Sequence, residues 1–131
     1  LKWFKGKYPY QVLLVQSLGQ LRYLSAVKHC ELVIGNSSSG LIEVPSFKKP
    51  TVNIGQRQAG RISGDTVINC NDSALSIAEA ISIALSKKFR DKCLTAVNPY
   101  GDGGSSKKIL DIIETVSLND LLIKKFNDIK V

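Results

Sequence analysis

The chain has 131 residues, of which 44% are apolar, and its formal net charge is +7. This length suits one domain or part of one, and this apolar content can fill a buried core, which excludes a disordered chain. No apolar run is long enough to span a membrane, and no signal-peptide pattern follows the first residue, Leu1. We therefore expect residues 1–131 to be a single, incomplete domain of a cytoplasmic protein, with no membrane partner.

The positive charges are scattered along the chain rather than gathered in one stretch. Lysines at helix ends and on solvent faces favour a general attraction for anionic ligands over a nucleic-acid surface, so we expect no nucleic-acid partner. Cys30, Cys70 and Cys93 are far apart and form no CxxC pair. That spacing predicts reduced thiols, no disulfide framework and no metal site.

The first part of the chain predicts alternating elements. Residues 1–10 are basic and aromatic, typical of a loose terminus or of the end of an element. Residues 12–15 form an apolar run that predicts a buried strand, and residues 20–29 have the spacing of an amphipathic helix. Residues 32–34 predict a strand buried on both faces, and residues 41–47 predict a short helix.

The second part continues the alternation. Residues 51–54 predict the next strand, and residues 56–65, rich in glycine and arginine, predict a long mobile loop. Later elements are predicted in this order: a strand at 66–70, a helix capped by Asp72 or Ser73, a short helix at 89–94, a loop at 98–106 that opens a helix to 116, and a final helix using Leu121, Leu122 and Phe126. Strands that alternate with helices predict an α/β fold, a Rossmann-like parallel sheet with helices on both faces.

The serine-rich turn at residues 35–40, Gly-Asn-Ser-Ser-Ser-Gly, connects a predicted strand to a predicted helix. Such a turn exposes unpaired N–H groups at the carboxyl edge of the sheet, where ligands of this fold class bind. Ser37 and Ser38 add hydroxyl donors, although one of them could simply cap the helix. We interpret the turn as a phosphate site, and most specifically as the diphosphate site of a nucleotide sugar.

Three charged residues complete the predicted site. Arg57 and Arg61 follow the next strand and could clamp a diphosphate through paired hydrogen bonds, or could be solvated loop charges. Glu43 lies just over one turn into the predicted helix, where its carboxylate could accept hydrogen bonds from ribose hydroxyls or could face solvent.

Three well-known site motifs do not fit the residues present: the P-loop, the nucleophile elbow and the Ser-His-Asp triad. Leu41 and Ile42 stand where a P-loop requires Lys and Ser or Thr, and Ser39 stands where a nucleophile elbow requires glycine. His29 is the only histidine and is expected to be a helix-end residue, so a Ser-His-Asp triad has little support.

Several spaced motifs together resemble the UDP-N-acetylglucosamine 2-epimerase family. They are the turn at 35–40, Glu43-x-Pro-Ser-Phe, the segment from Pro50 to Arg61 and Asn-Pro-Tyr-Gly-Asp-Gly at 98–103, and the spelling is most similar to the hydrolysing branch of the sialic-acid and legionaminic-acid pathways. The resemblance implies a glycosyltransferase-B-like enzyme of two Rossmann-like domains, of which this chain is most of the C-terminal, UDP-binding domain, with the N-terminal domain absent.

The resemblance also implies roles. Ser37 and Ser38 would contact the diphosphate, Glu43 the ribose and Arg57 the phosphates or the sugar, with Arg61 in the same loop and Ser17 at the border of the uracil pocket. The implied reaction eliminates UDP from the sugar and adds water, giving N-acetylmannosamine and UDP, without a cofactor or a metal. The acid and base residues are expected in the absent N-terminal part, so the chain alone is expected to bind UDP weakly without turnover. A homodimer is expected for the full-length protein.

Two other functions remain open. The donor domain of a nucleotide-sugar glycosyltransferase needs the same diphosphate clamp, and a noncatalytic module could use the basic charge to hold RNA or acidic partners. The exact sugar is also open, since a 2,4-diacetamido sugar would need a similar site. An incomplete sheet would expose a strand edge, which predicts self-association.

Overall fold

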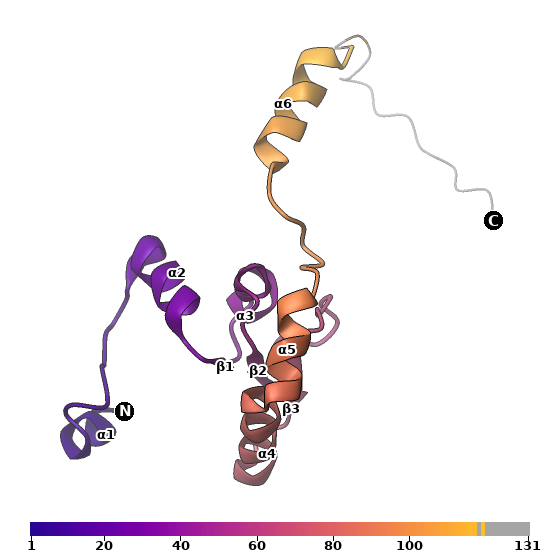
Figure 1. The fold of residues 1–131 in the computed structure, drawn as a ribbon. Coiled ribbons are helices and arrows are strands. Elements are labelled where there is room, and N and C mark those ends of the chain that lie inside the picture. Colours follow the sequence, from indigo (N-terminus) through magenta and orange to yellow (C-terminus); the bar gives the residue numbers. More distant parts are fainter. Residues whose placement is uncertain (118, 120–131) are drawn as a thin grey trace. The chain divides into compact units, whose positions relative to one another are not determined.

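The structure is a computed structural model that describes residues 1–117 and residue 119 (Figure 1). The chain divides into two compact units, Leu1–Gly101 and Asp102–Val131. The predicted final helix around Leu121, Leu122 and Phe126 lies outside the described residues. Among the described residues, no helix combines the length and the apolar character that crossing a membrane requires.

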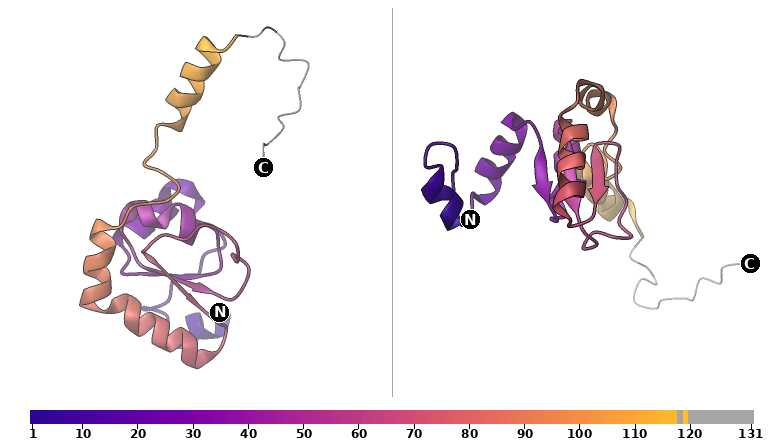
Figure 2. Two further views of the ribbon diagram at one scale, coloured as in Figure 1. Left: turned by 90° about the vertical axis from the view of Figure 1, so that its right-hand side faces the viewer. Right: turned by 90° about the horizontal axis from the view of Figure 1, so that it is seen from below.

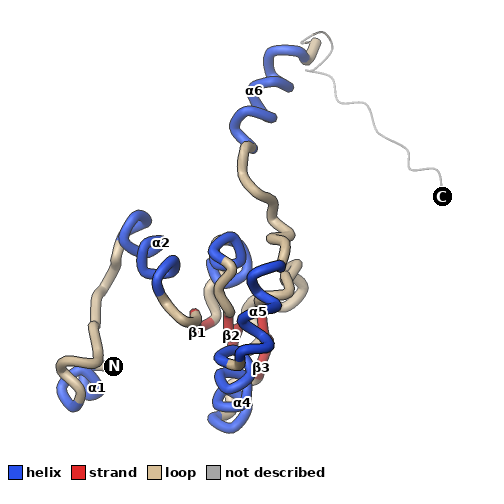
Figure 3. Tube along the Cα trace, viewed as in Figure 1, coloured by secondary structure: helices blue, strands red, loops and turns tan. Residues whose placement is uncertain are grey.

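A three-stranded parallel sheet forms the centre of the first unit, and its strands appear in red in Figure 3. The strands are β1 (Val33–Gly35), β2 (Thr51–Ile54) and β3 (Val67–Cys70), in the order β1-β2-β3. Valine, isoleucine and threonine dominate them, as suits a pleated and largely buried surface. The predicted α/β fold with a parallel sheet and helices around it is confirmed.

Helices occupy most of the remaining segments. They are α1 (Lys2–Lys7), α2 (Gly19–His29), α3 (Ser39–Ile42), the 3₁₀ helix η1 (Val44–Phe47), α4 (Ala74–Leu85), α5 (Lys87–Thr95) and, in the second unit, α6 (Ser105–Thr115). Ser73 Oγ accepts a hydrogen bond from the Ser76 N–H at 3.2 Å, so the predicted cap of α4 is confirmed. The predicted helices at 20–29, 89–94 and before 116 also form.

Helices cover both faces of β2. Neighbouring side chains of a strand point to opposite faces, and two consecutive residues of β2 contact different helices. Thr51 Oγ1 donates to the carbonyl oxygen of Gly40 in α3 at 3.0 Å. Val52, the next residue, is fully buried and packs with Ala80 and Ala84 of α4. The small side chains of α4 let this helix approach the sheet closely.

The connection from β2 to β3 contains no helix, and Figure 2 shows it as an irregular loop over residues 55–66. The predicted loop at 56–65 is therefore confirmed. A parallel connection of this length can return the chain to the opposite end of the sheet without a helix, so the first residues of this loop lie at the carboxyl edge and its last residues at the start of β3.

The strand β1 departs from the prediction of burial on both faces, since the Ile34 side chain is 46% exposed. The reason is the strand order: β1 lies at the edge of the described sheet and pairs only with β2. An apolar run predicts a strand here correctly, but it does not tell an edge strand from a central one.

The predicted strand at residues 12–15 is wrong. These residues have no regular structure and pair with no strand among the described residues, and Leu13 is 79% exposed. An apolar run favours a strand only where a neighbouring strand offers its N–H and C=O groups, and this segment does not lie along the free edge of β1.

The predicted helix at 41–47 forms as two short pieces that meet at Glu43. Pro45 explains the break, because its ring nitrogen has no N–H to donate to the carbonyl four residues earlier and its ring crowds that turn. The tighter 3₁₀ helix η1 accommodates Pro45 near its start. The macrodipole of such a short helix is small, so any ligand binding here relies on individual donors.

The close approach of α3 to β2 yields a stability prediction. A Cβ built on Gly40 would lie 2.7 Å from Thr51 Cγ2, so Gly40→Ala should lower the free energy of unfolding by about 1–3 kcal/mol. Adding Thr51→Ser removes that methyl group and keeps the hydroxyl, and should restore much of the loss. Denaturant unfolding of both variants measures the effect.

Gly6→Ala is the control, because nothing lies within 4 Å of a Cβ added there. It should leave stability unchanged or slightly raised. If the double variant were as unstable as the two single changes added together, the clash with Thr51 would not be the cause.

Candidate functional site

The end of β1 and the next-to-last residues of β2 and β3 form one row across the sheet. Gly35 of β1 is in register with Asn53 of β2, which is in register with Asn69 of β3. Asn53 Nδ2 donates to Asn69 Oδ1 at 2.8 Å, which joins β2 to β3 through side chains as well as backbone. Because the strands are parallel, the segments that follow this row all emerge at the same edge.

The serine turn follows β1 and presents donors. The backbone N–H groups of Ser37 and Ser38 have no acceptor among the described residues. Ser37 Oγ accepts from the Ser39 N–H at 3.3 Å, and the Ser39 hydroxyl makes a short hydrogen bond with the Tyr23 hydroxyl of α2. The turn is thereby held to α2 while the donors of its first two serines stay free.

The loop at residues 55–66, hereafter the arginine loop, is tied to the serine turn by Gln58. Gln58 is only 6% exposed, and its Nε2 donates to the carbonyl oxygen of Asn36 at 2.7 Å. The Gln58 side chain therefore connects the loop that carries Arg57 to the turn that carries Ser37. The two predicted phosphate-binding segments are therefore neighbours.

Both arginines of this loop are exposed and take part in no ion pair of the described structure. Arg61 lines a cavity of about 410 Å³ whose wall also includes Asn53 and Gln58. Arg57 does not line that cavity. The two guanidinium groups are thus available to an anion at different places along the loop.

Glu43 is exposed at the junction of α3 and η1 and likewise belongs to no ion pair in the described part of the chain. It does not line the cavity beside Arg61, and neither do Ser37 and Ser38. The structure therefore links the serine turn to the arginine loop through Gln58, places Arg61 in the adjoining cavity, and leaves Glu43 exposed at the junction of α3 and η1.

Residues 98–100 brace this edge from the far side of α3. Asn98 Nδ2 donates to the carbonyl oxygen of Ile42 at 2.9 Å and to Ser46 Oγ at 2.7 Å, which stabilises the end of α3. The Tyr100 hydroxyl donates to the carbonyl oxygen of Ile62 in the arginine loop at 3.0 Å. These residues hold the helix after the serine turn and the end of the arginine loop in fixed positions.

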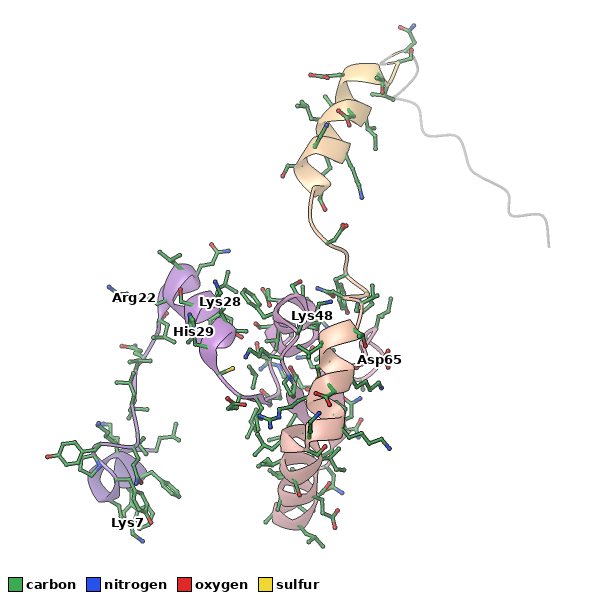
Figure 4. All side chains as sticks on the ribbon, in the orientation of Figure 1. Lys7, Arg22, Lys28, His29, Lys48 and Asp65 are labelled. Atoms are coloured by element: carbon green, nitrogen blue, oxygen red, sulfur yellow. The ribbon has the colours of Figure 1, made fainter. Side chains whose placement is uncertain are left out.

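The arginine loop has a further anchor on α5. Lys92 Nζ lies 2.9 Å from Asp65 Oδ1, and Figure 4 labels Asp65 where the loop passes α5. A Cβ on Gly64 would lie 2.9 Å from Pro99 Cδ, so the backbone packs closely there. The loop is held near Gln58 and again near Asp65, with its arginines exposed.

Sequence reasoning missed Tyr23, Gln58 and Asn98 as residues that hold the site. Each acts through a contact that is distant in the sequence, so no local pattern reports it. The one available signal was the residue pattern of the two segments that contain Gln58 and Asn98, because both segments carry the family resemblance. That pattern does not indicate what either side chain contacts.

His29 is the exposed last residue of α2, as the labelled view in Figure 4 shows, so its prediction as a helix-end residue is confirmed. The three cysteines are free thiols, as predicted. Burial raises the pKa of the Cys93 thiol and of the Cys30 thiol, an effect that Lys92 and Lys49 respectively oppose. Raised pKa values make both thiols poor nucleophiles near neutral pH.

Comparison with known proteins gives one matching family. Residues 2–114 match the profile of the family described as UDP-N-acetylglucosamine 2-epimerase. That match spans the sheet, the serine turn, the arginine loop and nearly all of α6.

Individual relatives are similar over most of this chain. Polysialic acid biosynthesis protein P7 of Escherichia coli is 41% identical over 100 residues, which cover 76% of this chain and 25% of the relative. The GDP/UDP-N,N'-diacetylbacillosamine 2-epimerase (hydrolyzing) of Campylobacter jejuni is 36% identical over 124 residues, covering 94% and 32%. The UDP-N,N'-diacetylbacillosamine 2-epimerase (hydrolyzing) of Legionella pneumophila is 30% identical over 116 residues, covering 88% and 30%. The chain thus spans about a quarter to a third of the length of these curated relatives.

Proposed function

The chain belongs to the UDP-N-acetylglucosamine 2-epimerase family, and on that premise we propose that it is the UDP-binding part of a hydrolysing UDP-sugar 2-epimerase. In this proposal it contributes most of the C-terminal Rossmann-like domain of a two-domain, glycosyltransferase-B-like enzyme. The sugar is N-acetylglucosamine or a 2,4-diacetamido sugar, and two of the relatives are named for the latter class.

The observation that carries this proposal is the hydrogen bond from Gln58 to the Asn36 carbonyl. It connects the turn that carries the free N–H groups of Ser37 and Ser38 to the loop that carries Arg57, which supports a shared site. Backbone N–H groups, serine hydroxyls and a guanidinium group are the donors that hold phosphate oxygens in proteins. The two phosphate groups of a diphosphate would bind to donors of the serine turn and to donors of the arginine loop.

A second observation supports the place of the nucleoside. Ser17 and Tyr23 line an open cavity of about 460 Å³, and the Tyr23 hydroxyl bonds to Ser39 of the serine turn. The cavity therefore adjoins the proposed diphosphate site. In this proposal it borders the uracil, the exposed Glu43 carboxylate accepts from the ribose hydroxyls, and Arg61 binds the phosphates or the sugar.

The proposed reaction has two steps. A base removes the proton at C2 of the sugar while the bond from C1 to the diphosphate oxygen breaks, giving a glycal and UDP. Water then adds to C1 and a proton to the opposite face of C2, which releases the free 2-epimer. Negative charge develops on the diphosphate in the first step, so the donors of the serine turn and the arginine loop stabilise the leaving group. Acid and base roles are assigned to the rest of the full-length protein.

The first test is the titration of UDP into the chain by calorimetry. The double variant Ser37→Ala/Arg57→Ala removes one hydroxyl and one guanidinium group, each a charge-assisted contact to the diphosphate, so affinity should fall by about ten-fold or more. Ser82→Ala/Lys88→Ala is the matched control, because it removes a hydroxyl and a positive charge from exposed positions on α4 and α5. Equal losses in the two double variants would show a general charge effect and contradict the proposed site.

The reaction is tested on the full-length protein that carries this chain. Incubated with the UDP-sugar and no acceptor, it should release UDP and the free 2-epimer, N-acetylmannosamine if the sugar is N-acetylglucosamine. Magnetic resonance of the sugar's anomeric protons identifies the product directly. Release of UDP only when an acceptor sugar is added, with transfer of the sugar to that acceptor, would instead identify a glycosyltransferase.

A further inference from the structure

Gln58 is a buried polar side chain, and its burial has to be explained because an apolar residue would be more favourable there. It is 6% exposed, and its Oε1 has no partner in the described structure. Burying an amide without full hydrogen bonding is unfavourable, and an apolar side chain of the same shape would fill the space without that cost. The bond from its Nε2 to the Asn36 carbonyl, at 2.7 Å, is the feature that an apolar side chain could not supply.

That hydrogen bond sets the orientation of the whole peptide unit between Asn36 and Ser37, not only of its carbonyl group. A peptide unit is planar and trans, so its C=O and its N–H point in opposite directions. Holding the Asn36 carbonyl toward Gln58 therefore fixes the direction of the Ser37 N–H, the first free donor of the serine turn. Gly35, one residue before this peptide unit, has φ 155°, a conformation that side-chain-bearing residues rarely adopt.

We infer that Gln58 is a positioning residue for a diphosphate. It fixes the direction of the Ser37 N–H and ties the arginine loop, which carries Arg57, to the serine turn, so that the two segments are arranged before the ligand binds. This inference rests on the proposed function and adds a residue to it. Gln58 itself touches the Asn36 peptide rather than the phosphate, and it reduces the ordering that a ligand would otherwise have to impose on two loops.

Gln58→Met tests this role, because methionine keeps the length and apolar contacts of glutamine and loses the N–H donor. Asn36 is exposed, so water can replace the lost partner of its carbonyl and the fold should persist. UDP affinity, measured by titration of the ¹⁵N-labelled chain, should fall about ten-fold. Affinity for uridine, which lacks phosphates, should stay within about two-fold of the unchanged chain.

The ligand-free spectrum gives an independent measure. Rotation of the 36–37 peptide unit should move the Ser37 amide resonance in Gln58→Met by more than resonances far from the turn, such as that of Ser76. Gln11→Met is the control, since Gln11 is an exposed glutamine that does not line the cavity beside Arg61 and its side chain makes no hydrogen bond in the described structure. It should leave both the Ser37 resonance and UDP affinity unchanged.

Three distinguishable outcomes would contradict either the positioning role of Gln58 or the proposed function. UDP affinity that is the same in Gln58→Met and the unchanged chain would refute the positioning role. Equal losses for UDP and uridine would show that Gln58 supports the fold generally and would also refute it. If the unchanged chain bound uridine but gained nothing from the diphosphate, the proposed function would fail, while a moved Ser37 resonance would still identify Gln58 as the residue that sets the peptide.

Discussion

The shared register of Gly35, Asn53 and Asn69 is the constraint from which the edge of the sheet is built. Parallel pairing makes the three strands end within one residue of each other, and the side-chain bond between Asn53 and Asn69 joins β2 to β3 in the row where β1 ends. A slip of one residue would move each strand's inward side chains to the other face and would separate the segments that follow. The serine turn and the arginine loop meet because β1 and β2 end within one residue of each other at the same edge.

Side-chain hydrogen bonds then hold in place the segments that the strand register brings to one edge of the sheet. Tyr23 holds the serine turn to α2, Gln58 holds it to the arginine loop, and Asn98 holds the helix that follows. The contacts come from segments far apart in the chain, and they leave N–H, hydroxyl and guanidinium donors free on the serine turn and the arginine loop. Such fixed donors suit an anion whose charge increases as a bond breaks, which is the demand that a leaving diphosphate makes.

The sequence alone was sufficient for the elements whose signals are local. The serine turn, the strands at 51–54 and 66–70, and the capped helix after Ser73 depend on turn residues, β-branched runs and caps that neighbouring residues determine. The strand at 12–15 was wrongly predicted because pairing depends on a partner that the run itself does not specify. The Gln58 bond could not be predicted for a similar reason: it joins residues that only the register of β1 and β2 brings together.

The most direct measurement is a map of where UDP binds, from amide resonances of the ¹⁵N-labelled chain during titration. Binding at the serine turn predicts that the largest changes fall on Ser37, Ser38 and Arg57. A cavity of about 440 Å³ beside Lys48 and Lys49, in which Arg90 is paired with Glu31, is a competing place where a purely electrostatic attraction would hold an anion. Largest changes around that cavity, with Ser37 and Arg57 unmoved, would contradict a diphosphate site at the carboxyl edge of the sheet.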